Sequence, residues 1–152
     1  MIEPYRAASV PKGIAIIEKE MQTLGFEVYD ALEKDDVLFI DSSHVVMPYG
    51  DTLTEFVSIL PRLNTGVLVH IHDIFLPFDY MPNWAEKNKV YTEQWVLALM
   101  LYGAASEWEV VWGSRIMMME QKDFLLTMKH YPGDKPNGGA MWIRKLGPAR
   151  RG

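Results

Sequence analysis

Two short apolar runs, each ending in acidic and imidazole side chains, constrain the fold of this 152-residue chain more than any other feature. The first run is Val37–Ile40, followed by residues 41–44 (Asp-Ser-Ser-His), and the second is Val67–Ile71, followed by His72 and Asp73. Runs without polar alternation are typical of strands that are covered on both faces. The sequence therefore predicts two buried parallel strands whose carboxyl ends carry the polar side chains.

Predicted helices alternate with strands along the rest of the chain, which favours an α/β fold with a mostly parallel sheet flanked by helices. Helical spacing predicts helices over residues 27–32, 51–63 and 92–102, and β-rich runs predict further strands over residues 14–17, 108–112 and 140–144. In the helix over residues 92–102, we expect Trp95, Val96, Leu99 and Met100 to point inward. The last two strands form a hairpin-like pair, which predicts an antiparallel edge.

Composition limits the classes of function. The length fits a single domain over residues 1–152, and 15 Lys and Arg against 20 Asp and Glu give a net charge of −5. Nucleic acid is not an expected partner, because phosphate contacts need clustered cations. The one dense basic run, Arg144, Lys145, Arg150 and Arg151, predicts a solvated tail.

Three absences narrow the classes of function further. No apolar run approaches the ~20 residues that span a bilayer, so no membrane partner is expected. The N-terminus lacks the basic start and apolar stretch of a signal peptide. Cysteine is absent, which excludes disulfides and thiolate metal sites and fits a reducing, cytoplasmic compartment.

The polar ends of the two apolar strands carry the candidate chemistry. If the strands are parallel neighbours, Asp41 and Asp73 meet at one edge of the sheet, where α/β folds bind ligands. Two carboxylates suit a hard cation such as Mg²⁺, which prefers oxygen ligands. His44, His72 and Asp73 are the candidate catalytic residues, because an imidazole there can act as a base or as a further metal ligand.

The same residues can also have purely structural roles or serve a different chemistry. An aspartate at a strand end often serves only as a helix cap or a partner for loop amides, and a histidine near a sheet is often a satisfied core side chain. His70 and His72 form an H-x-H pair on one face of a strand, a pattern that also binds Zn²⁺ or Fe²⁺. A metal-dependent hydrolase or dioxygenase that uses this pair is therefore an alternative.

The stretch from Asp36 to Ile74 resembles class I S-adenosylmethionine-dependent methyltransferases, in the branch that includes small-molecule O-methyltransferases and enzymes of surface-polysaccharide or natural-product pathways. Residues 37–44 are similar to the I-D-G-D-H run at the end of the family's fourth strand. Residues 66–73 resemble its G-G-x-x-x-x-H-D fifth strand. Asp51 and a helix end at residues 59–63 lie between these blocks, in matching order and spacing.

The resemblance implies a Rossmann-like sheet of strand order 3-2-1-4-5-7-6, with an antiparallel C-terminal strand, and methyl transfer from S-adenosylmethionine to a small-molecule or saccharide-type acceptor. It places Glu3 at the ribose of the cofactor and Gln22 near the adenine. It places Asp41 at the methionine end of the cofactor or at the metal, and Ser42 among the cofactor-binding residues. In metal-dependent members of the family, acids at the ends of the fourth and fifth strands hold the cation, which corresponds to Asp41 and Asp73 with Mg²⁺.

The family's first strand and glycine-rich loop have no counterpart, because no G-x-G-x-x-G or Walker A run occurs in the chain. We therefore expect either an N-terminally truncated methyltransferase-like domain that lacks the first strand or a rearrangement of the two strands that flank it. Truncation would leave exposed strand edges that favour a homo-oligomer. A non-catalytic methyltransferase-like fragment is a further alternative. The aromatic and proline-rich stretch over residues 74–88 predicts either a loop that covers the acceptor or a surface loop pinned by its own aromatics.

Overall fold

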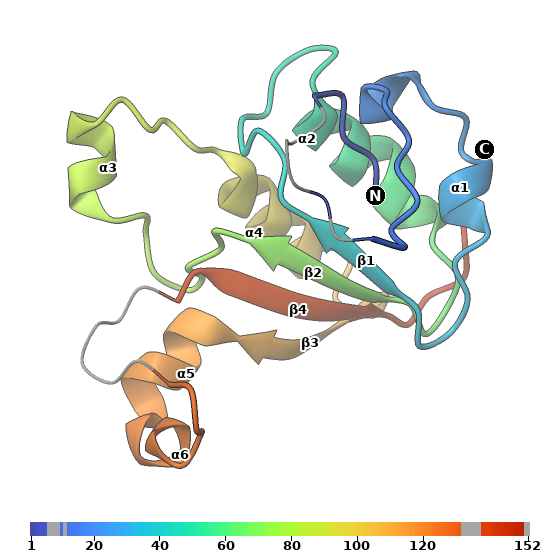
Figure 1. The fold of residues 1–152 in the computed structure, drawn as a ribbon. Coiled ribbons are helices and arrows are strands. Elements are labelled where there is room, and N and C mark those ends of the chain that lie inside the picture. The colour runs from blue at the N-terminus through green and yellow to red at the C-terminus, as the bar shows by residue number, and fades with distance from the viewer. Residues whose placement is uncertain (6–9, 11, 132–137, 151–152) are drawn as a thin grey trace.

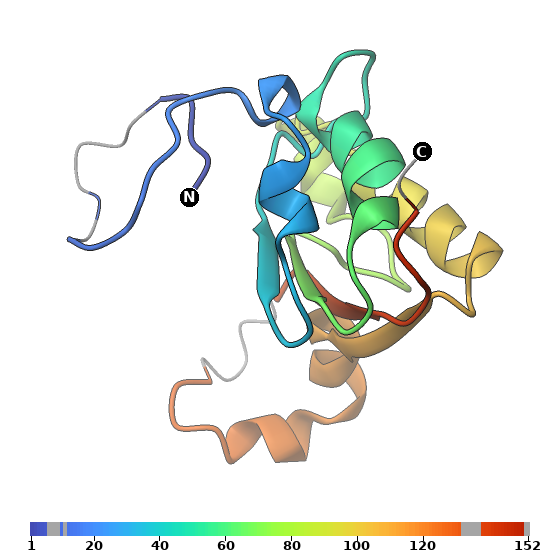
Figure 2. The same cartoon turned by 90° about the vertical axis from the view of Figure 1, so that its right-hand side faces the viewer.

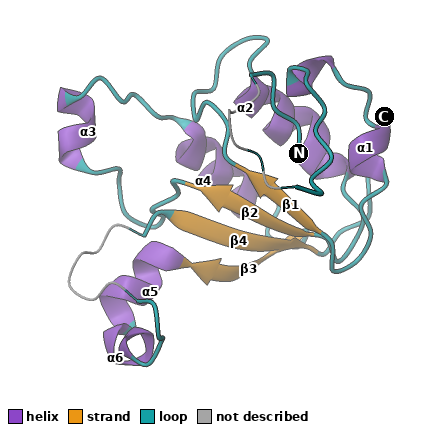
Figure 3. Ribbon diagram, in the orientation of Figure 1, coloured by secondary structure: helices purple, strands orange, loops and turns teal. Residues whose placement is uncertain are grey.

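The structure, a computed structural model, describes residues 1–5, 10, 12–131 and 138–150. Its centre is an open, mixed four-stranded sheet in an α/β fold (Figure 1; Figure 3). The strands are β1 (Val37–Ile40), β2 (Leu68–His72), β3 (Trp108–Gly113) and β4 (Ala140–Lys145), in the spatial order β1-β2-β4-β3. β1 and β2 are parallel, whereas β4 is antiparallel to both of its neighbours.

Short helical segments connect the strands. They are η1 (Met21–Thr23), α1 (Glu27–Asp30), α2 (Asp51–Thr54), the π-helical η2 (Glu55–Ile59), the 3₁₀-helical η3 (Leu60–Arg62), α3 (Pro82–Glu86), α4 (Glu93–Gly103), α5 (Ser114–Glu120) and α6 (Lys122–Leu126). The turn into β2 is made at Gly66, whose φ of +92° lies in the left-handed region that glycine adopts without strain. Within the described ranges, no helix is long and apolar enough to cross a membrane.

Helices α2 and α4 lie against the same face of the sheet, and the N-terminal segment lies on the other side (Figure 2). The helix-covered face contributes the apolar core, which includes Ile40, Val69, Ile71, Met141 and Ile143 from the sheet and Phe56, Ile59, Leu60 and Leu97 from the helices. On the opposite face, Val37 is 47% exposed and Phe39 is 60% exposed. The prediction that β1 is covered on both faces is therefore wrong. Every second side chain of β1 lies on the face that no helix covers.

One further prediction about strands is wrong. Residues 14–17 do not form a strand, and Ile17 makes only a single parallel bridge with Ile2. Ile14 is 47% exposed, so this segment buries little apolar surface that would stabilise a longer pairing. The predicted antiparallel edge is present, with β3 outermost and β4 between β2 and β3. The antiparallel pairing of the last two strands is confirmed.

The inward face of α4 differs in part from the predicted one: Val96 and Met100 pack against the core as predicted, whereas Trp95 and Leu99 do not. Trp95 is 43% exposed and Leu99 is 72% exposed, whereas Glu93 and Gln94 are fully buried. Hydrophobic spacing assigned the apolar residues to the core, but Glu93 has a partner there in His44. A buried acid with a hydrogen-bond partner takes the position that the apolar pattern predicts for a hydrophobe.

The C-terminal basic run is not solvated throughout. Lys145 in β4 is fully buried, with its Nζ 3.0 Å from Glu107 Oε2 and over the ring of Trp108. Arg144 donates to Glu109 Oε2 over 2.7 Å. Both cations are paired within the fold because acids in β3 and just before it lie beside the end of β4. Arg151 lies outside the described residues.

A matched pair of valines tests the one-sided core. Val69→Ala removes two methyl groups from a fully buried side chain in β2 and should lower the free energy of unfolding by about 2–3 kcal/mol. Val37→Ala, on the neighbouring strand but half-exposed, should cost less than about 1 kcal/mol. Urea unfolding of the two variants measures the difference. Equal losses of unfolding free energy in Val69→Ala and Val37→Ala would contradict the conclusion that no helix covers this face of β1.

Candidate functional site

The register between β1 and β2 brings two polar strand ends together. Ile40 pairs with Ile71 in the parallel ladder, so the residues that follow each strand leave the same edge of the sheet. His72 Nδ1 lies 3.6 Å from Asp41 Oδ1 and 3.3 Å from Asp73 Oδ1. The predicted meeting of Asp41 and Asp73 at one edge is thus present in the structure.

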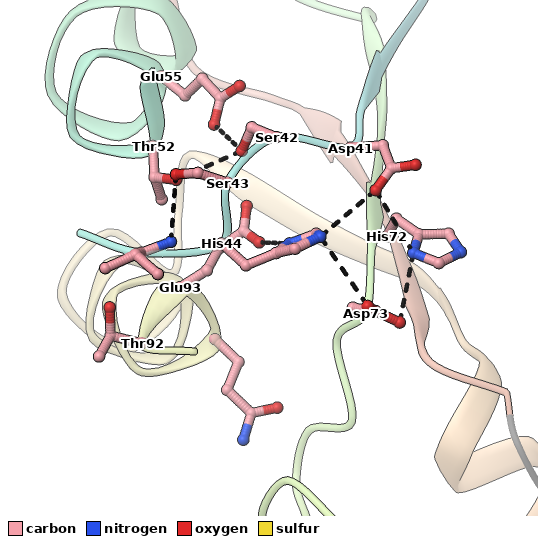
Figure 4. A network of polar contacts seen from close by, with 12 residues as sticks. Asp41, Ser42, Ser43, His44, Thr52, Glu55, His72, Asp73, Thr92 and Glu93 are labelled. Carbon is pink, nitrogen blue, oxygen red and sulfur yellow. Dashed lines mark hydrogen bonds and ion pairs between the residues drawn. The ribbon is translucent and has the colours of Figure 1, made fainter. Parts of the chain in front are cut away.

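His44 completes a group of four side chains, Asp41, His44, His72 and Asp73, which we call the rim cluster (Figure 4). His44 Nε2 lies 3.3 Å from Asp41 Oδ1 and 3.9 Å from Asp73 Oδ2. The side chain of His44 is 7% exposed, whereas those of His72 and Asp41 are 45% and 52% exposed. The cluster therefore has a buried side at His44 and an open side at His72 and Asp41.

A buried carboxylate orients His44, and the sequence analysis missed it. Glu93 Oε2, in the first turn of α4, lies 2.7 Å from His44 Nδ1 (Figure 4). Because Nδ1 faces Glu93, the other ring nitrogen, Nε2, points toward the two aspartates. The only signal in the sequence is an acid at the start of an apolar helix. Its partner lies 49 residues earlier in the chain, beyond the reach of any local pattern.

The charges around His44 favour its protonated form. Burial alone would lower the pKa of His44, but the hydrogen bond to Glu93 and the negative charges of Glu93, Asp73 and Asp41 outweigh it and raise the pKa above 6.5. Burial raises the pKa of Glu93, and the bond to His44 opposes that rise. Each partner of the pair therefore stabilises the charged form of the other, and the Nδ1 proton is held between them.

Behind the rim cluster, hydroxyl groups connect the strand end to two further acids. Ser42 Oγ donates to Glu55 Oε2 over 3.0 Å, and the backbone N–H of Ser43 donates to Asp51 Oδ2 over 2.9 Å. Burial, followed by the negative charge of Glu93, raises the pKa of Glu55 to about 8. Glu55 is therefore protonated at neutral pH and holds Ser42 in place as a neutral acid.

Two members of the rim cluster have an uncommon backbone conformation. His44 has a φ of +60° and Asp73 a φ of +52°, in the left-handed region. Backbone hydrogen bonds hold both residues: His44 accepts from the N–H of Thr92 over 2.9 Å, and Asp73 donates to the carbonyl of Gly139 over 2.7 Å. Conformations of this kind concentrate at functional sites, where the surrounding structure maintains them.

An open cavity of about 900 Å³ lies beside the rim cluster. Its lining includes all four residues predicted to bind the cofactor, namely Glu3, Gln22, Asp41 and Ser42. Asp41 belongs both to this lining and to the rim cluster. The structure therefore joins a cavity large enough for a small ligand to the group of histidines and aspartates.

His70 does not join the rim cluster. Its ring stacks on Phe39 with a centroid distance of 4.4 Å, and the residue is 8% exposed. Burial lowers its pKa, and the nearby His72 adds to this effect. Among the described residues, the group able to hold a metal contains His72 together with His44 and Asp41, and not His70. Of the two histidines in the H-x-H pair, His70 thus stacks on Phe39, and His72 belongs to the rim cluster.

The aromatic stretch after β2 lies next to the rim cluster. The ring of Tyr91 is 4.5 Å from the ring of His44, measured between centroids. Trp84 contacts Tyr91 at 5.1 Å and stacks on Tyr80 at 5.7 Å. These contacts form an aromatic layer (Tyr80, Trp84 and Tyr91) that both pins the loop to itself and places it beside His44.

Comparison with known proteins gives no relative. No protein-family model matches the chain, and no curated protein and no solved structure matches it significantly. Any functional assignment therefore depends on the residues and the geometry of the cavity and the rim cluster.

The buried Glu55 gives a pH-dependent prediction. Its pKa is raised in the folded chain, so the unfolded chain loses the proton first, and stability falls as pH rises from about 5 toward 8, by up to about 1.4 kcal/mol per pH unit. Glu55→Gln should remove this contribution, flatten the profile and raise the free energy of unfolding at pH 8. Urea unfolding of the parent and of Glu55→Gln between about pH 5 and 8 measures both the slope of the profile and the free energy of unfolding at pH 8.

The exposed Glu86 in α3 supplies the control, because Glu86→Gln should leave the pH profile of the parent unchanged. Parallel profiles for the parent and Glu55→Gln would show that Glu55 is already ionised in the folded protein.

Proposed function

We propose that the chain is an S-adenosylmethionine-dependent methyltransferase domain that acts on a small-molecule or saccharide-type acceptor. The observation that carries the proposal is the position of Asp41, which lies in the cavity lining and in the rim cluster at once. Methyl transfer is an in-line displacement, so the donor and the acceptor must be held close and aligned. A donor cavity that ends at a group of acid and imidazole side chains meets that requirement.

The arrangement of the strands is compatible with the proposal. The order β1-β2-β4-β3 corresponds to the 4-5-7-6 part of the sheet that the resemblance implies, with the antiparallel β4 between its two neighbours. The parallel bridge between Ile2 and Ile17 corresponds to the adjacent second and third strands. Because such sheets host many functions, the site rather than the fold supports the assignment.

The cavity residues suit a nucleoside. The Glu3 carboxylate accepts the backbone N–H of Tyr5 over 3.0 Å and has further acceptor capacity for both hydroxyls of a ribose. Gln22 offers an amide, which can both donate to and accept from an adenine edge. The exposed ring of Phe39 adds an apolar wall to the same cavity. With the ribose at Glu3 and the adenine at Gln22, Asp41 and Ser42 lie toward the sulfonium end of the cofactor.

The rim cluster is the proposed acceptor end. S-Adenosylmethionine supplies a methyl group activated by its sulfonium, and the chain has to position the acceptor hydroxyl and accept its proton. The imidazole of His72, or that of His44 when it is unprotonated, can take that proton, with Asp73 as a hydrogen-bond partner. A cation held by Asp41 and Asp73 would serve the same end by lowering the pKa of the hydroxyl. The aromatic layer beside His44 would exclude water from the acceptor.

Binding of S-adenosylhomocysteine tests the proposal without knowledge of the acceptor. Isothermal titration should show one site per chain, and Glu3→Gln should weaken binding about 10- to 100-fold, because a charge-assisted hydrogen bond to the ribose is lost. Glu33→Gln changes an exposed acid outside the cavity lining and should leave the affinity unchanged. A folded parent that does not bind, or equal affinities for the parent and Glu3→Gln, would overturn the assignment.

A further inference from the structure

The polar atoms of the rim cluster face one another without forming hydrogen bonds that satisfy them. His72 Nδ1 is buried and has no hydrogen-bond partner within the part of the chain that the structure describes, although two carboxylate oxygens lie 3.3 and 3.6 Å away. His44 Nε2 likewise faces an oxygen of Asp41 and one of Asp73. The two ring nitrogens and one carboxylate oxygen of Asp41 therefore lie close enough to share one ion, with Asp73 beside them (Figure 4).

The spacing of these atoms suits a small divalent ion. A transition metal binds nitrogen and oxygen ligands at about 2.0–2.1 Å, so four ligands in a tetrahedral arrangement lie about 3.3–3.4 Å from one another. Asp41 Oδ1 lies 3.3 Å from His44 Nε2 and 3.6 Å from His72 Nδ1, and the ligand atoms of these three residues all lie within 4.8 Å of one another. Closure around an ion would therefore need only small shifts of the side chains.

The buried pair of His44 and Glu93 is an independent indication. A histidine that binds a metal typically donates its other ring N–H to a carboxylate, which fixes the tautomer and the ring orientation. Glu93 takes this position at Nδ1, at 2.7 Å, with both side chains more than nine-tenths buried. Nε2 is thereby directed toward the aspartates, and a metal ion bound there would displace its proton.

We propose that the rim cluster binds one divalent transition metal ion, with Asp41, His44 and His72 as ligands, Asp73 beside them and Glu93 as the residue that positions His44. Two imidazole ligands favour ions such as Zn²⁺ over Mg²⁺, which takes oxygen ligands and keeps its waters. The two carboxylates balance the charge of the ion. In this assignment the histidines are ligands, and the ion rather than a free imidazole activates the acceptor.

The exposed side of the rim cluster gives the ion a role in the proposed reaction. Asp41 and His72 are half-exposed, so the site opens toward solvent beside the cavity. A hydroxyl bound there would lose its proton more readily, because the ion stabilises the alkoxide. This role of the ion rests on the proposed methyl transfer, whereas metal binding itself does not. Titration with S-adenosylhomocysteine tests the methyltransferase assignment, and titration with Zn²⁺ tests the metal site.

Titration with the metal alone tests the site. The full chain, stripped with a chelator and confirmed as folded by circular dichroism, should bind one Zn²⁺ in calorimetry and should bind Mg²⁺ much more weakly. Co²⁺ in place of Zn²⁺ should give visible absorption bands of a four- or five-coordinate site with nitrogen and oxygen ligands.

Three substitutions and a control separate this site from adventitious binding. His72→Gln and Asp41→Asn alter half-exposed ligands, so the fold should survive, and each should weaken Zn²⁺ binding at least tenfold. Glu93→Gln removes the charge behind His44 and should weaken binding 10- to 100-fold, as loss of such outer carboxylates typically does. His130→Gln, an exposed histidine outside the cluster, should leave the affinity unchanged.

Three results would overturn the metal site: no stoichiometric Zn²⁺ binding by the folded parent, tighter binding of Mg²⁺ than of Zn²⁺, or equal Zn²⁺ affinities for the parent and His72→Gln. Zn²⁺ binding without any binding of S-adenosylhomocysteine would keep the metal site and reject the methyltransferase assignment. The reverse result would keep the methyltransferase assignment and reject the metal site.

Discussion

The parallel pairing of β1 and β2 is the constraint on which the rest of the site depends. Because Ile40 is paired with Ile71, the two chain segments leave the sheet at the same edge, and Asp41 and Asp73 are brought within reach of the same two imidazoles. A shift of one residue in this register would turn the side chains of one strand to the opposite face. The buried core below the strands fixes the register, so the energetics of packing determine the geometry of the site.

The contact between α4 and the loop after β1 is the second essential element. Glu93 and His44 are each costly to bury alone, and together they satisfy one another in the core. The short hydrogen bond between them offsets this cost, and it also fixes the ring of His44, which cannot rotate without leaving Glu93 unpaired. A helix that would otherwise only cover the sheet thereby positions a side chain of the rim cluster, which is why an acid replaces an apolar residue at that point of α4.

Local sequence patterns predicted the parts of the structure that local energetics determine. The strand Val37–Ile40 and the convergence of Asp41 and Asp73 follow from apolar runs and from strand direction, and both are present. The inward position of Glu93 could not be predicted, because its burial depends on a partner distant in sequence. The uncovered side of β1 was missed for a related reason, since an apolar run does not specify what packs against Phe39.

The central claim is that Asp41 joins two adjoining sites, a nucleoside cavity and a metal-binding cluster. A crystal structure of the chain with Zn²⁺ and S-adenosylhomocysteine, with anomalous data collected at the zinc absorption edge, tests it most directly. The account predicts one anomalous peak between the side chains of Asp41, His44, His72 and Asp73, with the sulfur of the ligand on the cavity side of Asp41. A peak at another surface site, or a ligand bound away from that cavity, would contradict it.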